Sequence, residues 1–307
     1  MKGTILITDS LFIFPEHEKQ IRDAGYEIER LDKPEASEEE LVEAVKGKVG
    51  YILAGIESVT EKIIDSGDQL KAIVFTGIGY KDFIPAWEHA IKKGISIANT
   101  PDAPTHAVAE WALTMALAMN RNIFDLGRVG EKTFMTSKGI ENQKIGIVGF
   151  GRIGQEIARM IKPFKPASVS YYSKHQHKGA EYAELNNVLS QSDIIFTCLP
   201  KDAGANFVGA EQLALIKDKS LLISFMAEGI IDDAALLKEL QSGRIRAASD
   251  HPLKDAAAKD LPLSIWYCFN GSNAFNTFTE LKQCSDAATK SILNLLETGK
   301  DENQVNI

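Results

Sequence analysis

The fold of this chain is decided by the stretch Lys144-Ile145-Gly146-Ile147-Val148-Gly149-Phe150-Gly151-Arg152-Ile153-Gly154. Residues 145–148 are typical of a strand buried in a parallel sheet, and residues 155–161 continue with helical spacing. The glycines between them follow the pattern GxGxxG. Gly149 permits a tight turn, Gly151 lets the backbone approach a pyrophosphate, and Gly154 lets helix and strand pack closely. The stretch therefore predicts a dinucleotide-binding turn that includes Phe150, Arg152 and Ile153, with the helix N-terminus directed at the phosphates.

The composition predicts a soluble protein of two domains. The chain has 307 residues, 44% of them hydrophobic, which is enough for a large core. Its formal net charge of -8 argues against nucleic acid or an anionic membrane as a partner, because both bind basic surfaces. The three cysteines, Cys198, Cys268 and Cys284, are too few and too scattered for a disulfide framework or a metal site. We expect them to be buried, without a catalytic role, in a reducing compartment.

The N-terminal segment has neither the charge nor the apolar length of a signal peptide. No stretch approaches eighteen consecutive apolar residues, which a membrane-spanning helix would need. We therefore expect the protein in the cytoplasm.

The first hundred residues alternate short apolar strands with amphipathic helices. Ser37 stands three residues before Glu40, which predicts a capping box, and Gly25 and Gly94 are expected helix stops. Strands are expected at 4–8, 26–30, 49–54, 72–75 and 95–98, separated by helical stretches such as 38–46 and 85–93. This is the pattern of a βα-repeat domain.

A second βα series follows a long apolar helix at 107–119 and a glycine-containing segment at 127–143. Its six expected strands are 144–148, 169–172, 194–199, 221–225, 245–249 and 266–269. Six strands fit a doubly wound dinucleotide-binding sheet, so the fold class is α/β. A last helix is expected at 280–297, and the tail 300–307 is expected to be frayed.

Several segments, in this order, resemble the D-2-hydroxyacid dehydrogenase family over nearly the whole chain. They are Gly77-Ile78-Gly79, Asn99-Thr100-Pro101, Ala107-Val108-Ala109-Glu110, the fingerprint at Gly149, residues 213–223, Ile230-Ile231-Asp232 with Ala235-Leu236, and Asp250 after a strand. The resemblance implies a flavodoxin-like substrate domain with an inserted Rossmann-type doubly wound parallel sheet domain. The implied boundaries are 1–99 plus 279–307 for the substrate domain and 100–278 for the dinucleotide-binding domain.

The same resemblance implies the roles of particular residues. The active site would lie in the cleft between the domains, where the backbone at Ile78 and Gly79 would hold a substrate carboxylate. Thr105 and Pro200 would lie near the cofactor, and Asp250 would reach the nicotinamide carboxamide. A homodimer would form through the helix around Trp111 and the segment 121–143, which is shorter than is usual for the family.

The end of the second Rossmann strand indicates which dinucleotide is bound. NAD-preferring sites have Asp or Glu there, whose carboxylate binds the ribose hydroxyls and repels a 2′-phosphate. Here the strand ends Tyr171-Tyr172-Ser173-Lys174-His175, followed by His177 and Lys178. The position nearest the ribose is Ser173, or Tyr172 if the alignment shifts by one. We therefore predict NADP as the preferred cofactor, with NAD possible and with contacts from Ser173 and Lys174; a merely solvated loop is the alternative.

The positions of the family's catalytic residues hold other residue types in this chain. The family binds and polarises its substrate with an arginine, moves the hydroxyl proton with a histidine, and tunes that histidine with a glutamate. The arginine position holds Ala227, or Glu228 with a shift of one. The glutamate position holds Asp255, and the histidine position is assigned to Asn273.

Two interpretations follow from these substitutions. In the first, the chain is an NAD(P)-dependent oxidoreductase that reduces a small 2-oxo acid or related carbonyl, with Asp255, Asn273 and Lys81 as the candidate catalytic residues. Lys81 would supply the missing positive charge, and His251 or His106 would relay a proton. In the second, the chain binds the dinucleotide but turns over little, as a regulatory protein.

Overall fold

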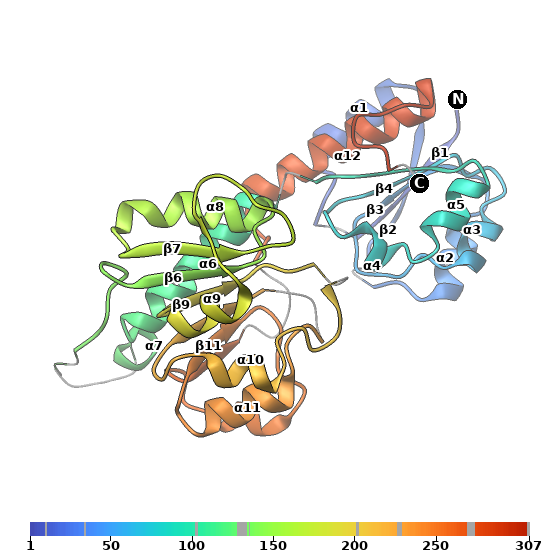
Figure 1. Ribbon diagram of the computed structural model, residues 1–307. Coiled ribbons are helices and arrows are strands. Elements are labelled where there is room, and N and C mark those ends of the chain that lie inside the picture. Colours follow the sequence, from blue (N-terminus) through green and yellow to red (C-terminus); the bar gives the residue numbers. More distant parts are fainter. Residues whose placement is uncertain are drawn as a thin grey trace. The chain divides into compact units, whose positions relative to one another are not determined.

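The chain folds into two compact α/β units. The structure is a computed structural model that describes residues 1–9, 11–33, 35–101, 104–127, 134, 136–200, 203–225, 229–268 and 274–305. Unit 1 consists of Met1–Pro104 and Asn276–Ile307, and unit 2 of Thr105–Phe275 (Figure 1). None of the helices in these described ranges has the length and apolar character that a bilayer crossing needs.

Unit 1 is built on a parallel sheet with the strand order β2-β1-β3-β4-β5. This is the flavodoxin-like order, so the fold class predicted for the first domain is confirmed. The strands are β1 (Thr4–Thr8), β2 (Glu27–Leu31), β3 (Lys48–Leu53), β4 (Ala72–Phe75) and β5 (Ser96–Asn99). The helices are α1 (Pro15–Asp23), α2 (Glu38–Ala44), α3 (Glu61–Ser66), α4 (Tyr80–Phe83), α5 (Trp87–Lys92) and the final α12 (Phe278–Thr298).

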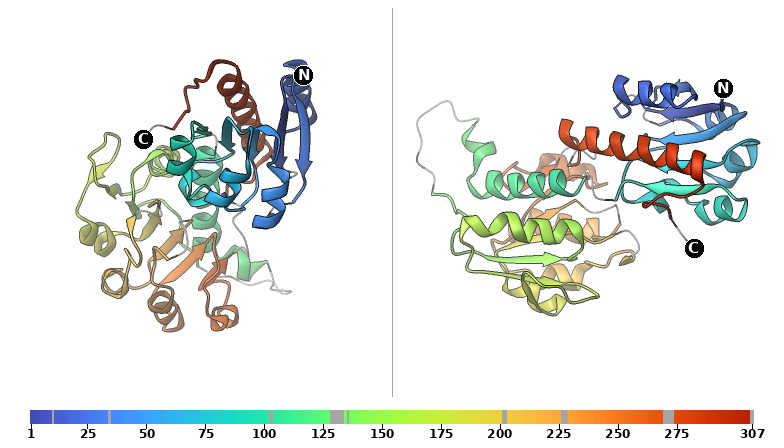
Figure 2. Two further views of the ribbon diagram at one scale, coloured as in Figure 1. Left: turned by 90° about the vertical axis from the view of Figure 1, so that its right-hand side faces the viewer. Right: turned by 90° about the horizontal axis from the view of Figure 1, so that it is seen from above.

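Helices cover both faces of the unit 1 sheet. On one face, α2, α3 and α5 share an apolar cluster with β1, β3, β4 and β5. On the other face α12 packs so closely on β3 that a Cβ at Gly50 would lie 3.1 Å from Ile292. Helix α1 lies beside α12 (Figures 1 and 2), and the ring of His17 joins them, since Nδ1 accepts from the Phe14 N–H and Nε2 lies 2.8 Å from Asp286 Oδ1. The final helix α12 is therefore part of unit 1 and packs on its sheet.

Local sequence signals explain the helix ends in unit 1. The Ser37–Glu40 capping box is present, and Gly25 and Gly94 have positive φ values of 94° and 81° after their helices, as predicted. The expectation of a frayed tail is wrong for residues 300–305, and residues 306 and 307 lie outside the described residues. Asp301 accepts hydrogen bonds from Ser291 and Asn294, and the Val305 N–H donates to the Ile97 carbonyl at 2.8 Å. The tail thereby covers the edge of β5, which would otherwise expose unpaired backbone groups.

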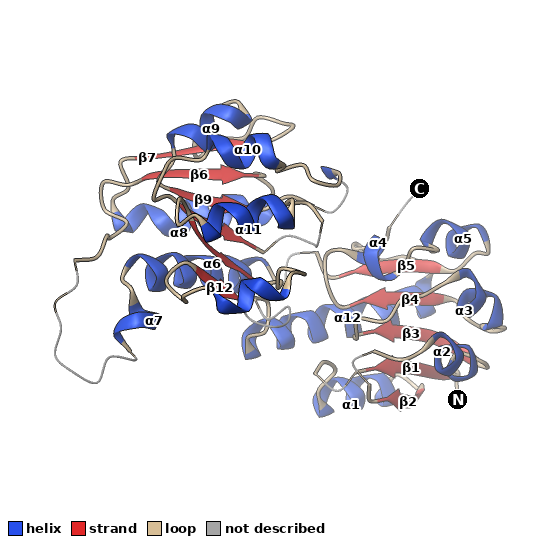
Figure 3. Cartoon of the chain, turned by 90° about the horizontal axis from the view of Figure 1, so that it is seen from below, coloured by secondary structure: helices blue, strands red, loops and turns tan. Residues whose placement is uncertain are grey.

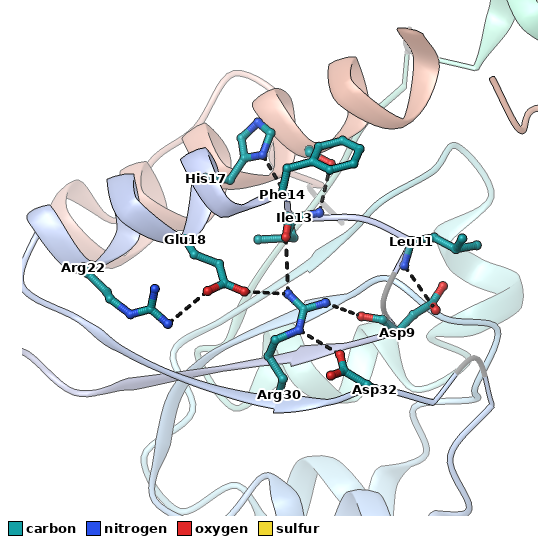
Figure 4. A network of polar contacts seen from close by, with 10 residues as sticks. Asp9, Leu11, Ile13, Phe14, His17, Glu18, Arg22, Arg30 and Asp32 are labelled. Atoms are coloured by element: carbon teal, nitrogen blue, oxygen red, sulfur yellow. Dashed lines mark hydrogen bonds and ion pairs between the residues drawn. The ribbon is translucent and has the colours of Figure 1, made fainter. Parts of the chain in front are cut away.

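Arg30 holds the loop that follows β1 (Figure 4). Its Nη2 donates to the Asp9 carbonyl at 2.6 Å and its Nη1 to the Ile13 carbonyl at 3.3 Å. The guanidinium also pairs with Glu18 at 3.0 Å and Asp32 at 2.8 Å. Asp9 and Ile13 have φ values of 61° and 59°, a region that aspartate tolerates but β-branched residues rarely adopt, so the loop is strained at Ile13, whose carbonyl Arg30 binds.

Unit 2 is built on a parallel sheet with the strand order β12-β11-β10-β9-β6-β7-β8. The strands are β6 (Lys144–Val148), β7 (Ser168–Tyr172), β8 (Glu181–Tyr182), β9 (Ile194–Thr197), β10 (Leu221–Ser224), β11 (Arg246–Ser249) and β12 (Trp266–Cys268). The helices are α6 (Thr105–Asn120), α7 (Ile123–Leu126), α8 (Arg152–Ile161), α9 (Leu185–Gln191), α10 (Ala210–Leu215) and α11 (Asp233–Gln241), with short 3-10 turns at η1 (Lys162–Phe164) and η3 (Ala256–Asp260). The doubly wound sheet predicted for the second domain is confirmed.

The expected number of six strands in this sheet is wrong. Among the described residues β8 adds a seventh, which pairs with β7 at the sheet edge. It spans only Glu181–Tyr182, so it is too short for an alternating pattern to reveal it.

Two apolar clusters fill the two sides of the unit 2 sheet. One joins α6 and α8 to residues such as Ile145, Ile147 and Phe196, and the other joins α9, α10 and α11 to Val148, Ile195 and Leu222 (Figure 3). Neighbouring strand residues point to opposite sides, which explains the unbroken apolar character of the strands.

Candidate functional site

Five neighbouring strands of unit 2 end level with one another at the carboxyl edge of the sheet. Their last paired residues are Tyr172, Val148, Thr197, Ser224 and Ser249. The chain runs from β6 outward to β8 and then returns to β9 on the other side of β6, so the direction of winding reverses between β6 and β9. In open α/β sheets, ligands bind outside the carboxyl edge at this reversal.

The fingerprint turn lies at this reversal and requires glycine at two positions. Gly149 has a φ of +95°, and a Cβ there would lie 2.6 Å from the Cys198 carbonyl oxygen on the loop after β9. At Gly154 a Cβ would lie 2.3 Å from the Gly149 carbonyl oxygen, because α8 packs directly on the turn. Both glycines are thus required by the fold of the turn.

Gly151 differs, because nothing lies within 4 Å of the position that its Cβ would take. It is the N-cap of α8, with φ -73° and ψ -159°, and no side chain caps the helix there. The N–H groups of the first helical turn have no partner within the helix. An open approach to a bare helix N-terminus fits a pyrophosphate, so this part of unit 2 suits a dinucleotide.

The other fingerprint residues take different positions. The Phe150 side chain is buried and stacks on Tyr171 with ring centroids 3.9 Å apart, so only its backbone faces the turn. Ile153 packs against the apolar cluster below α8. Arg152 is exposed as the first residue of α8.

Three further residues predicted to lie near the cofactor are Thr105, Pro200 and Asp250 in unit 2. The Thr105 hydroxyl, at the start of α6, is buried and has no hydrogen-bond partner among the described residues. Pro200 is exposed on the loop after β9, and Asp250 is buried directly after β11, where Oδ1 accepts from the Ala274 N–H at 3.2 Å. A buried hydroxyl without a partner is what a bound phosphate would satisfy.

No acidic residue ends β7. Ser173 follows the strand and is half-buried, and Lys174 is exposed beside it. The alternative position, Tyr172, packs its ring against Phe207 at 6.2 Å. The Tyr172 side chain is therefore engaged in packing, which favours Ser173 of the two candidate positions.

Ile78 and Gly79 lie on the loop after β4 in unit 1. The Ile78 carbonyl accepts from Asn99 Nδ2 at 3.0 Å and from the Tyr80 N–H at 2.9 Å, which holds the loop. Within the described part of the chain, the N–H groups of Ile78 and Gly79 donate to no other group. Such a loop can bind a carboxylate through its backbone.

Of the three candidate catalytic residues, the structure describes Lys81 and Asp255. Lys81 is exposed on α4, with its ammonium 4.9 Å from the centroid of the Trp87 ring. Asp255 is exposed and caps η3 by accepting from the Ala257 N–H, so its catalytic assignment rests on sequence position alone. Asn273, Ala227 and Glu228 lie outside the described residues.

The two histidines considered as proton relays differ in their surroundings. His251 is half-buried, and its backbone N–H donates to Ser249 Oγ at 3.1 Å. His106 Nδ1 lies 2.8 Å from Glu156 Oε1. The Arg159 guanidinium, with a smaller contribution from His106, lowers the pKa of the Glu156 carboxyl to about 2. His106 thus faces a carboxylate that is ionised at neutral pH.

Glu57, which follows β3, is a buried acid that no sequence motif indicates. Its side chain is buried, Oε1 accepts from the Tyr51 hydroxyl at 2.8 Å, and Oε2 meets no partner in hydrogen-bonding geometry within the described residues. Burial raises the pKa of this carboxyl, the neighbouring Asp9 raises it further, and the hydroxyls of Thr8 and Tyr51 offset part of the rise. A glutamate in a loop carries no local sign of burial, so the pattern could not reveal it.

Replacing Glu57 by glutamine should change how stability depends on pH. Because the folded protein holds this proton more tightly than the unfolded chain, wild-type stability is fully present below the unfolded pKa of about 4.3 and falls as pH rises toward the folded pKa. Glu57→Gln removes that loss, which amounts to about 1.4 kcal/mol for each tenfold difference in proton affinity between the folded and unfolded states. Urea unfolding at pH 4 and pH 8 should show the variant gaining on wild type only at pH 8. Parallel profiles would contradict the prediction.

The expectation that all three cysteines are buried is wrong for two of them. Cys284 is buried, whereas Cys198 and Cys268 are half-buried at the carboxyl ends of β9 and β12. Desolvation raises the pKa of the Cys268 thiol to about 12 and that of Cys284 to about 11. Both therefore stay protonated at neutral pH.

Comparisons with known proteins agree with this arrangement. Residues 113–268 match the family model of the D-isomer specific 2-hydroxyacid dehydrogenase, NAD binding domain. The chain is 30% identical over 268 residues to a glyoxylate reductase of Pyrococcus furiosus, covering 81% of this chain and 78% of the relative. It is 31% identical over 278 residues to a D-3-phosphoglycerate dehydrogenase of Methanocaldococcus jannaschii, covering 84% of this chain but 50% of that protein.

The fold matches solved structures over its whole length. An acyclic imino acid reductase, solved in complex with NADPH and D-arginine, superimposes with a TM-score of 0.88 at 23% identity, covering 99% of this chain and 100% of the other. At that identity the match shows the fold alone. The sequence matches go further: the chain belongs to the D-isomer specific 2-hydroxyacid dehydrogenase family and is an NAD(P)-dependent oxidoreductase of that type.

Proposed function

We propose that this protein is an NADPH-preferring reductase of a small 2-oxo acid or a related carbonyl compound. The observation that carries the cofactor preference is the end of β7, where Ser173 and Lys174 stand in place of an acid. NADPH, when bound, supplies the hydride. A serine hydroxyl and a lysine ammonium would bind the 2′-phosphate, whereas an aspartate would repel it.

The residues of each unit have separate parts in this proposal. In unit 2, Gly151 and the α8 N-terminus bind the pyrophosphate, the Thr105 hydroxyl donates to a phosphate oxygen, and Asp250 orients the carboxamide. In unit 1, the N–H groups of Ile78 and Gly79 bind the substrate carboxylate. Their donors are in place before substrate arrives, so little ordering entropy is lost on binding.

Lys81 supplies the positive charge that the arginine position lacks. It follows Gly79 by two residues, and the Trp87 ring holds its ammonium at the start of α4. A cation beside the carboxylate strengthens binding through Coulomb attraction. Asp255 and Asn273 remain the candidates for moving the proton, on their sequence positions.

Steady-state kinetics with both reduced cofactors test this function. We expect a lower KM for NADPH than for NADH with 2-oxo acids such as glyoxylate and hydroxypyruvate, and a clear NADH preference would refute the cofactor assignment. Lys81→Ala should raise the KM for the 2-oxo acid about tenfold or more while the Kd for NADPH stays unchanged. Lys46→Ala is the control, because Lys46 is exposed ahead of β3, at the amino edge of the sheet, whereas Lys81 follows β4 at the carboxyl edge.

The interpretation as a catalytically weak regulatory protein is tested in the same experiment. Tight binding of the dinucleotide without turnover of any 2-oxo acid or aldehyde would favour it. The relatives named above are a reductase and a dehydrogenase, and they favour turnover.

We also propose that the protein is a homodimer, formed through α6 and the segment after it, and that it acts in the cytoplasm. Free thiols at Cys198, Cys268 and Cys284 are compatible with a reducing compartment. Sedimentation equilibrium should give twice the chain mass of 33.7 kDa, and a monomer mass would exclude the dimer.

A further inference from the structure

Tyr171 connects the fingerprint turn to the loop that follows β7. Its side chain is fully buried in the cluster between the sheet and α8. The ring stacks on Phe150, the residue between Gly149 and Gly151, with an interplanar angle of 16°. The ring of Tyr171 thus packs directly against the phosphate-binding turn.

The Tyr171 hydroxyl reaches the backbone of His177, six residues along the chain. It donates to the His177 carbonyl at 2.7 Å and accepts from the His177 N–H at 2.5 Å. The His177 ring lies tilted beside this pair of rings, 6.0 Å from Phe150 and 6.4 Å from Tyr171 between centroids. Both backbone groups of one loop residue are therefore held by a single buried side chain.

This anchored loop carries the charge expected at the 2′-phosphate. Lys174, His175, His177 and Lys178 are all exposed, and Gly179 turns the chain with a φ of 112°. Exposed lysines ordinarily sample many conformations, and ordering such a side chain on binding costs free energy. A loop whose backbone is already fixed avoids a further ordering cost when it binds an anion.

We propose that the Tyr171 hydroxyl is a positioning group that fixes residues 173–178 for recognition of the dinucleotide 2′-phosphate. The proposal rests on the NADPH preference proposed above. Tyr171 touches neither cofactor nor substrate in this role. It acts through the loop backbone, and its hydroxyl distinguishes NADPH from NADH because only NADPH carries the phosphate that the loop would bind.

Tyr171→Phe tests the proposal, since it keeps the ring stack and removes the two hydrogen bonds. We expect the Kd for NADPH, measured by calorimetric titration, to rise about tenfold, because the loop must then be ordered when the phosphate binds, while the Kd for NADH changes less than about twofold. Amide hydrogen exchange of residues 174–178 in the cofactor-free protein should accelerate in the same variant.

Tyr182→Phe is the matched control. Tyr182 lies on the adjacent β8, its ring meets Tyr171 edge-on at 5.8 Å, and its hydroxyl donates to Glu184 at 3.2 Å and to no loop residue within the described part. It should leave both dissociation constants unchanged. An equal weakening of NADPH and NADH by Tyr171→Phe, or an unchanged ratio of the two constants, would overturn the positioning role. A wild-type preference for NADH would instead refute the proposed function, independently of how the variant ratio behaves.

Discussion

Gly151→Asp should abolish dinucleotide binding without harming the fold. The backbone at Gly151 is extended, with φ -73°, and nothing lies within 4 Å of the new Cβ, so aspartate fits without strain. Aspartate is also a favoured N-cap and would accept from the first N–H groups of α8. Its carboxylate would then fill the approach to those groups and repel the pyrophosphate. We expect the Kd for NADPH and NADH alike to rise about a hundredfold or more, equivalent to about 2.7 kcal/mol.

Calorimetric titration and thermal unfolding together check this prediction. The unfolding midpoint of Gly151→Asp should match or exceed that of wild type. Gly154→Ala is the contrasting variant, because its Cβ would meet the Gly149 carbonyl oxygen at 2.3 Å. That overlap should lower stability by about 1–3 kcal/mol. Retained binding in Gly151→Asp would show that the cofactor does not approach α8 here.

Arg30→Met should destabilise unit 1 by about 2–3 kcal/mol. Methionine keeps much of the apolar stem but removes the donors to the carbonyls of Asp9 and Ile13, both of which have positive φ in the loop after β1. The guanidinium is mostly buried, with 21% of the side chain exposed, so the lost bonds are charge-assisted and only partly replaced by water. Urea unfolding should report the loss, and amide exchange should accelerate at residues 11–14.

Arg22→Met gives the matched comparison. Arg22 pairs with the same Glu18 at 3.0 Å, but its side chain is 52% exposed and no carbonyl of the strained loop is among its partners in the described structure. An exposed pair of this kind contributes about 0–1 kcal/mol. Equal effects of the two substitutions would show that the bonds of Arg30 to the loop carbonyls contribute nothing beyond its ion pairs.

Most elements of the fold could be predicted from local patterns. Strands 4–8, 72–75 and 144–148 were predicted with the bounds that the structure has, because each is a short apolar run between clear stops. The capping box at Ser37 likewise depends on residues three apart. The elements that were missed depend on distant partners. β8 forms only because β7 lies beside it, and the tail is ordered by bonds to α12 and β5.

The candidate site divides in the same way. The GxGxxG spacing and the missing acid after β7 are local facts, and each predicted a property of dinucleotide binding. Glu57 and Tyr171 could not be recognised, since nothing adjacent to them in the chain indicates what their side chains meet. Lys81 and Asp255 were chosen by position, and their surroundings, an aromatic ring and a helix cap, emerged only from the fold.

The succession of strands along the chain, the place of the phosphate-binding turn and the family of this protein follow from its residues, because periodicity and turn chemistry act over a few neighbours in the chain. Tertiary structure alone decided that the Glu57 carboxyl is buried, with one oxygen bonded to Tyr51, and that the Tyr171 hydroxyl holds the loop after β7. Those properties depend on the distances between groups that the chain brings together only on folding. The Tyr171 side chain, for example, stacks on Phe150 in the turn and hydrogen-bonds to the backbone of His177.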